Sequence, residues 1–145
     1  MREHLAKLPT ECVNELTEKI DMVPVEEKLR MINNEDKKIA LIIEQEIPTI
    51  AQAVKFAVTS LKNGGRIIYI GAGTSGRIGV IDASEILPTY GENNAFLAHM
   101  AGGKEAFTSP VEGAEDSKES GCKAVSEMNI TSRDTVIGIT ASGRT

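Results

Sequence analysis

The residues best suited to chemistry lie in a glycine-rich stretch, Gly71–Arg77, which carries a threonine and a serine between its glycines. Glycine lets the backbone turn sharply and brings its N–H groups close to a ligand. Thr74 and Ser75 add hydroxyl donors, and the positive end of the helix expected after them favours an anion. The stretch therefore predicts a phosphate-binding loop. Its candidate contacts are Gly73, Thr74, Ser75 and Gly76.

The same glycines formally match the G-x-G-x-x-G pattern of dinucleotide-binding folds. Such a fold needs an acidic residue at the end of the second strand to hold a ribose, and this chain has Ala98-His99-Met100-Ala101 there. The Walker pattern also fails, because no Lys-Ser or Lys-Thr follows Gly76. A phosphate monoester needs several donors around its three oxygens, so the two hydroxyls favour a sugar phosphate. A glycine turn that only connects a strand to a helix is the alternative.

A second turn with hydroxyl side chains, Thr140–Gly143, follows a later strand pattern and adds Thr140 and Ser142 to the candidate sugar-phosphate contacts. The strands are expected at residues 67–70, 96–100 and 135–139, with helices at 75–87, ended by Pro88, and at about 116–128. Alternating strands and helices imply a parallel sheet covered by helices on both faces. In such a sheet the turns after the strands meet at the carboxyl edge, where ligands bind.

Before the first strand the sequence is helical. Residues 1–22 read as a loosely held helical arm, and residues 24–34 as a short helix ending at Asn33-Asn34. Apolar residues then recur at spacings of three and four as far as Leu61, which predicts a long helix that Pro48 breaks or kinks into two. The expected division is a helical arm at 1–45 and a sugar-phosphate-binding domain at 46–145.

Composition excludes several classes of protein. The 145 residues fit one domain, and a net charge of −5 with 3% aromatic residues argues against nucleic-acid binding. The longest apolar runs are too short to span a bilayer, so no membrane association is expected. Two cysteines and two histidines without metal-ligand spacing predict reduced thiols and no metal site. These features are typical of a cytoplasmic protein.

A longer stretch, Gly71–Glu85, resembles the signature of N-acetylmuramic acid 6-phosphate etherases, which belong to the sugar isomerase (SIS) domain superfamily. Segments 32–38, 111–116 and 138–145 agree in order and spacing, so the resemblance covers about residues 29–145. It implies a three-layer αβα sandwich with a parallel sheet, flavodoxin-like and preceded by N-terminal helices. The family continues for roughly as many residues again, so we expect the chain to be truncated.

The resemblance also implies an activity. The family cleaves the D-lactyl ether of N-acetylmuramic acid 6-phosphate by elimination and hydration, releasing N-acetylglucosamine 6-phosphate and D-lactate during recycling of cell-wall sugar, without a metal or organic cofactor. By motif position, Glu85 would protonate the departing lactate and Glu115 would remove the proton at carbon 2. A proton next to an aldehyde needs a positioned base, and an alkoxide leaving group needs an acid. Without the resemblance, both glutamates read as solvated or helix-terminal carboxylates.

Glu85 lies ten residues beyond Ser75, about 15 Å along an unbroken helix. One short sugar phosphate cannot bridge that distance along the same helix. Either the helix breaks before Glu85, or Glu85 serves a site built across a subunit interface. We expect the interface, and therefore a homodimer with shared sites.

Several alternatives stay open at the level of sequence. Arg77 either contacts the phosphate or caps the surface beside the loop, and His99 is expected to have a packing or surface role. After Glu85 the family usually has Cys-Pro-Pro-Thr, where this chain has Ile86-Leu87-Pro88-Thr89.

Glucokinase regulatory proteins share the domain but lack the Asp-Ala-Ser-Glu stretch. A non-catalytic sugar-phosphate-binding regulator is therefore the alternative function, together with an inactive fragment. An aldose–ketose isomerase of the superfamily does not carry this signature.

Overall fold

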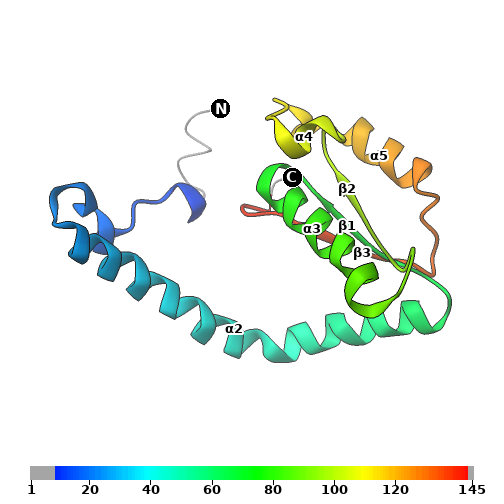
Figure 1. Cartoon of the computed structure of the whole chain (residues 1–145), viewed down its shortest axis with the longest axis horizontal. Coiled ribbons are helices and arrows are strands. Elements are labelled where there is room, and N and C mark those ends of the chain that lie inside the picture. The colour runs from blue at the N-terminus through cyan, green and yellow to red at the C-terminus, as the bar shows by residue number, and fades with distance from the viewer. Residues whose placement is uncertain (1–8, 144–145) are drawn as a thin grey trace. The chain divides into compact units, whose positions relative to one another are not determined.

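The structure, a computed structural model, describes residues 9–143 (Figure 1). Its elements in chain order are η1 (Pro9–Glu11), η2 (Glu15–Thr17), η3 (Ile20–Met22), α2 (Val25–Lys62), β1 (Ile67–Gly71), α3 (Gly73–Tyr90), β2 (Phe96–Met100), α4 (Glu105–Thr108), η4 (Ala114–Asp116), α5 (Lys118–Glu127) and β3 (Thr135–Ile139). The chain forms two compact units, Met1–Ala53 and Val54–Thr145.

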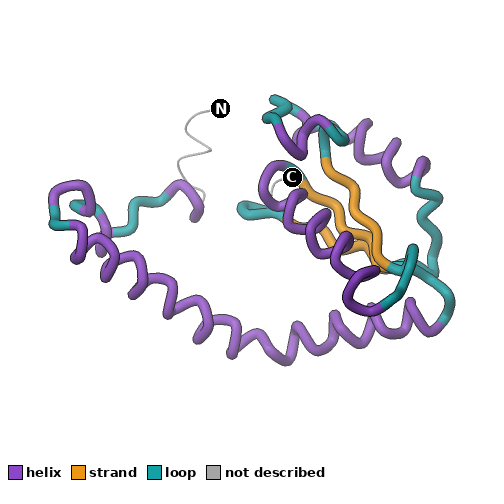
Figure 2. The backbone as a smooth tube through the Cα atoms, viewed as in Figure 1, coloured by secondary structure: helices purple, strands orange, loops and turns teal. Residues whose placement is uncertain are grey.

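The second unit is built on a parallel sheet of three strands in the order β2-β1-β3 (Figure 2). Ile70 of β1 lies opposite His99 of β2 and Gly138 of β3, so all three strands end together. The predicted α/β class and parallel sheet are confirmed, and β2 and β3 have the expected bounds. The glycine loop and the Thr140–Gly143 turn therefore leave the sheet at the same edge.

The two connections between strands use opposite faces of the sheet. The chain passes from the central strand to β2 through α3, which contacts β1 and β2 on the face where Tyr69 points. It then returns across β1 to β3 through α4, η4 and α5. Because parallel crossovers are right-handed, reversing direction at β1 sends the second connection over the other face. The carboxyl end of β1 is thus the point where the strand order switches, a preferred ligand position in open sheets.

The core is centred on β1, where Ile67 and Ile68 are fully buried. Side chains of the outer strand β3 are more open, with Val136 at 46% and Ile137 at 36% of their maximal exposure. Ala106 and Ala124 are buried where α4 and α5 pack on the sheet unit. Water is therefore excluded from the centre of the sheet, whereas β3 exposes apolar side chains.

An ion pair fastens β1 to β3 at the opposite, amino edge of the sheet. The Nε and Nη2 atoms of Arg66 donate to the two carboxylate oxygens of Asp134 at 3.1 and 2.9 Å, and the Arg66 backbone N–H donates to Oδ1 at 2.8 Å. The Asp134 side chain is 3% exposed. The hydrogen bonds from Arg66 hold the pKa of Asp134 well below its usual range. This pair sets the position of β3 beside β1.

The long helix α2 differs from the expectation. It is continuous through Asn33-Asn34 and Pro48, so the predicted end of a short helix and the predicted division into two helices are wrong. Asparagine lowers helix stability by less than about 0.7 kcal/mol, and one proline removes one hydrogen bond from a cooperative helix of 38 residues. The helix-forming residues on either side of Asn33-Asn34 and Pro48 therefore outweigh the destabilising effect of these residues.

The helix after the glycine loop is also longer than predicted. α3 begins at Gly73 and runs through Pro88 to Tyr90, so the expected end at Pro88 is wrong. Gly91 ends it in the left-handed conformation (φ 73°), and its N–H donates to the Leu87 carbonyl at 2.9 Å. A proline in the last turn removes one terminal hydrogen bond, which the helix tolerates.

The first unit holds η1, η2 and η3 and the beginning of α2. Asn14 caps η2 by accepting from the Leu16 N–H at 3.0 Å, and its amide donates to Glu35 of α2 at 3.0 Å. Lys38 also donates to Glu35 at 2.6 Å, and the hydrogen bonds from Lys38 and Asn14 lower the pKa of Glu35. Residues 9–22 thus form three short turns, while residues 1–8 of the predicted arm lie outside the described residues. Within residues 9–143, no helix is long and apolar enough to cross a membrane.

Candidate functional site

The glycine loop forms the junction between β1 and α3. Gly73, the first residue of α3, has φ +55°, and a Cβ built on it would meet nothing within 4 Å. Ala72, the N-cap residue, makes no side-chain capping bond to the first turn of the helix. The N-cap residue thus offers no side-chain acceptor to the first-turn amides of α3, and Gly73 lines a cavity, an arrangement that suits an anion.

Gly76 has a packing role in the same loop. It is buried, and a Cβ on it would approach the Gly71 carbonyl oxygen to 2.6 Å and Met100 to 2.9 Å. Any larger residue would push α3 away from the strand ends. The prediction that Gly76 also contacts a ligand stays a prediction.

Tyr69 of β1 lies against α3 farther along the helix. A Cβ on Gly79 of α3 would lie 2.7 Å from that of Tyr69, so helix and strand are closely packed there. Burial raises the pKa of Tyr69 to about 12, and the Asp82 carboxylate of α3 acts in the same direction. The close packing at Gly79 holds the helix on the sheet, while the Tyr69 ring lies 6.4 Å, centroid to centroid, from that of Phe96 on the neighbouring strand β2.

Arg77 fastens α4 to the glycine-loop helix. Its Nε donates to the Phe107 carbonyl at 2.8 Å, and its Nη2 donates to the Ala106 carbonyl at 2.8 Å. The cation thus satisfies carbonyls of α4, where the helix dipole favours positive charge. Of the two roles left open by the sequence, the contacts favour capping.

A cavity of about 210 Å³ lies between the glycine loop and the segment that follows α4. Ala72 and Gly73 line one side, Arg77 lies at its border, and Glu112 and Glu115 line the other side. The structure therefore brings the predicted phosphate loop and the predicted base, Glu115, to one cavity.

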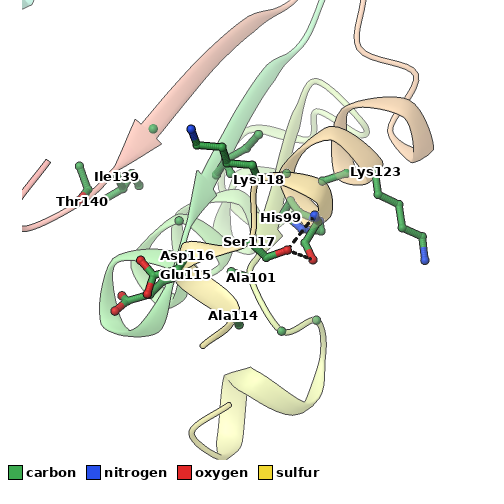
Figure 3. A pocket seen from close by; sticks show the side chains of 18 of the residues that line it. His99, Ala101, Ala114, Glu115, Asp116, Ser117, Lys118, Lys123, Ile139 and Thr140 are labelled. Carbon is green, nitrogen blue, oxygen red and sulfur yellow. Dashed lines mark hydrogen bonds between the residues drawn. The ribbon is translucent and has the colours of Figure 1, made fainter. Parts of the chain in front are cut away.

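A larger cavity of about 660 Å³ lies between the carboxyl edge of the sheet and α5 (Figure 3). Its lining includes Thr140 from the turn after β3, His99 from β2, and the start of α5. Glu115 lines this cavity as well as the smaller one, so the residue lies where the two cavities meet. A ligand held at the glycine loop could extend past Glu115 into the larger space.

Other predicted site residues lie outside these two cavities. Thr74 is exposed and Ser75 half-buried in the first turn of α3, and Ser142 is exposed in the last turn. That turn is closed by a hydrogen bond of 3.1 Å from the Gly143 N–H to the Thr140 hydroxyl. Glu85 is exposed on α3, which continues unbroken from Gly73 past it, so the alternative of a break before Glu85 is wrong.

Two features of the site could not be predicted from the sequence. α4 has four residues, too few for a visible period, and the contacts of Arg77 with it join residues 29 and 30 positions apart. Lys118 lines the larger cavity but belongs to no pattern in the sequence. His99 is half-buried and lines the same cavity, and its packing or surface role stays a prediction.

Residues 49–145 match the family described as the glucokinase regulatory protein N-terminal SIS domain. The chain belongs to this SIS-domain family. The predicted SIS fold and the resemblance to the etherase family are thus confirmed, the latter by relatives that match along the chain.

This SIS-domain chain is 53% identical over 146 residues to N-acetylmuramic acid 6-phosphate etherase of Clostridium acetobutylicum, a match covering 100% of the chain and 48% of the relative. It is 47% identical to the proteins of the same name from an Exiguobacterium species and from Escherichia coli, covering 97% of the chain and 48% of each relative. The chain spans about half the length of the curated relatives it matches.

Proposed function

We propose that this chain carries the phosphate-binding loop and the catalytic base of an N-acetylmuramic acid 6-phosphate etherase, a carbon–oxygen lyase acting in the cytoplasm. The observation that carries the proposal is the position of Glu115, which borders both the cavity at the glycine loop and the larger cavity beyond it. The identity to proteins of that name, along the chain, supports the same assignment.

In the proposed reaction, each step is carried out by residues at the carboxyl edge of the sheet. The first turn of α3, with Gly73, Thr74 and Ser75, holds the phosphate of the open-chain sugar, and the Thr140–Ser142 turn contacts the sugar. Glu115 removes the proton at carbon 2. The electron pair forms a double bond between carbons 2 and 3, the bond from carbon 3 to the ether oxygen breaks, and an acid protonates the departing lactate. Water then adds to carbon 3.

Glu85 is the proposed acid, and it acts from a second copy of the chain. On its own helix it lies 12 residues beyond Gly73, about 18 Å along the axis. The exposed apolar stripe of α2 supports a homodimer, because side chains at helical spacing are left open to solvent there: Ile39, Ile42, Ile43, Ile47 and Ile50.

Mixing a Glu85→Gln chain with a Glu115→Gln chain should then restore lactate release above that of either variant alone. Equal, residual activity of the mixture would contradict a shared site.

A coupled assay for D-lactate tests the activity itself. N-acetylmuramic acid 6-phosphate should yield lactate with the chain, and Glu115→Gln should lower the rate by at least about 10²-fold, the usual contribution of a positioned base. Glu119→Gln is the matched control, because Glu119 is an exposed carboxylate of α5 outside both cavities. Equal rates for the two variants would refute the role of Glu115.

A non-catalytic regulator is the second candidate, because the matching family is described by the name of a regulatory protein. The same assay separates the two. Binding of sugar phosphate without lactate release would favour the regulator, and absence of binding would favour an inactive fragment.

A further inference from the structure

The larger cavity is lined by a positively charged side chain that has no role in the proposed reaction. Lys118 is the first residue of α5 and lines this cavity, three positions after Glu115. Within residues 9–143 its ammonium group makes no ion pair or hydrogen bond. Figure 3 shows the Lys118 side chain extending toward the strand ends, on the side of the cavity where Thr140 lies.

A second lysine of the same helix provides a contrast. Lys123 also lines the cavity, but its Nζ lies 3.6 Å from the Glu127 carboxylate. In Figure 3 its side chain points away from the cavity. Lys118 is therefore the lysine of this lining whose charge remains available to a ligand.

The remaining charges of the lining make an anion costly there without a cation. Glu115 and Asp116 both line the cavity, and both carboxylates are exposed. A ligand carboxylate close to them would be repelled, since like charges at short range raise the energy of the complex. Lys118 can offset that repulsion, because an ammonium group donates charge-assisted hydrogen bonds to carboxylate oxygens.

The order of groups along the proposed substrate matches the order of the two cavities. Its phosphate is on carbon 6, the proton that leaves is on carbon 2, and the lactyl ether with its carboxylate is on carbon 3. With the phosphate at Gly73 and carbon 2 at Glu115, the lactyl group extends into the larger cavity, away from the loop.

We propose that Lys118 binds the lactyl carboxylate of the substrate and so distinguishes the ether from the sugar phosphate that lacks it. This inference rests on the proposed function, because it uses the glycine loop as the phosphate site and Glu115 as the base. It adds a specificity-determining residue on α5 and a subsite for a carboxylate.

The experiment compares two ligands that the chain cannot consume. Reduction of carbon 1 to the alcohol removes the aldehyde that acidifies the carbon 2 proton, and leaves phosphate and lactyl groups intact. The ligands are reduced N-acetylmuramic acid 6-phosphate and reduced N-acetylglucosamine 6-phosphate, which differ in the lactyl group. Calorimetric titration should show the parent chain binding the lactyl ligand about tenfold more tightly, a difference of 1.4 kcal/mol.

Two variants locate the source of that preference. Lys118→Met should remove the preference, because it should weaken binding of the lactyl ligand about tenfold and change the affinity for the other ligand less than about twofold. Lys123→Met, which removes the same charge from the same helix, should retain the preference. Higher salt should reduce the preference of the parent chain, because an exposed charge pair is screened.

The possible failures are distinguishable. An equal loss for both ligands in Lys118→Met, or a preference that survives in it, refutes the carboxylate subsite while lactate release by the parent chain leaves the proposed function standing. A parent chain that binds both ligands equally also refutes the subsite. A parent chain that binds neither ligand and releases no lactate refutes the proposed function, and the subsite with it.

Discussion

Replacing Asp134 by asparagine tests whether the ion pair at the amino edge holds β3 beside the central strand. Besides the three hydrogen bonds from Arg66, the Asp134 carboxylate accepts from the Thr131 N–H at 2.8 Å and from the Thr131 hydroxyl at 3.2 Å. Asparagine has the same shape but one acceptor oxygen, so its NH₂ group must face N–H donors on one side. The replacement thus removes the charge and leaves part-buried Arg66 donors unsatisfied.

The expected loss follows from that geometry. Breaking a buried ion pair costs about 3–5 kcal/mol and breaking an exposed one about 0–1 kcal/mol, and this pair is intermediate, because the Arg66 side chain is 27% exposed and that of Asp134 is 3% exposed. Because asparagine keeps one acceptor, we expect Asp134→Asn to lower the free energy of unfolding by about 2 kcal/mol. For a chain of this size that corresponds to a fall in Tm of roughly 6 °C. Urea and thermal unfolding followed by circular dichroism measure both quantities.

A matched control uses the exposed pair on α5. Lys123 and Glu127 are 74% and 62% exposed, and their charged groups are 3.6 Å apart. Glu127→Gln makes the same chemical change as Asp134→Asn, but an exposed helical pair contributes only about 0.3–0.5 kcal/mol. Equal losses for the two variants would refute the reasoning from burial.

The pH dependence of the difference gives a second test. The pKa of Asp134 is lowered in the folded chain, mainly by the hydrogen bonds from Arg66. A lowered pKa means that the ionised Asp134 carboxylate stabilises the fold at pH values above its pKa in the unfolded chain, which is about 3.9. This contribution is lost as the pH falls below that value. The gap in unfolding free energy between the parent chain and Asp134→Asn should therefore narrow below about pH 4. A gap that stays constant from pH 7 to pH 3 would contradict the ion-pair account.

Two further predictions concern the packing of the site. Arg77→Met should speed amide hydrogen exchange across residues 105–116 by about tenfold, a loss of 1.4 kcal/mol of local stability, whereas unchanged exchange would show that Arg77 does not hold α4. Gly79→Ala should lower the unfolding free energy by about 1–3 kcal/mol, because its Cβ would lie 2.7 Å from that of Tyr69. Gly121→Ala, whose Cβ would meet nothing within 4 Å on α5, should instead raise it by about 0.5–1 kcal/mol, and urea midpoints of the two variants that move together would refute the steric argument.

The sheet was predictable because its strands are short apolar runs between strong turn signals. Phe96–Met100 and Thr135–Ile139 were expected with the bounds that the structure has. The extents of α2 and α3 were not predictable from the helix-breaking residues in their sequences. Pro48 and Pro88 both lie inside helices, since the many hydrogen bonds of each helix outweigh the one that a proline removes.

The sequence predicted where the glycine loop lies but not which residues surround it. Spacing indicated a loop at the end of β1, where the structure has one, and its role as a phosphate site stays a prediction. Which carboxylate reaches that loop depends on the path of the chain after β2, which Arg77 fixes by holding α4. Contacts of that kind join distant residues, so periodicity cannot reveal them. The availability of Lys118 likewise depends on how α5 begins, at the Ser117 cap.

The positions of the two glutamates relative to β1 explain why one chain brings only Glu115 to the loop. Glu115 lies on the crossover from β2 to β3, which must pass the carboxyl edge of β1 because the strand order reverses there. Glu85 lies on α3, which leaves that same edge and carries each successive residue about 1.5 Å farther from it. Rotation of α3 about its axis cannot shorten that separation, and Tyr69 fixes the helix against the sheet in any case. If both glutamates serve one sugar, a second α3 must therefore approach the cavities from another chain, and loss of self-association should abolish turnover while sugar-phosphate binding persists.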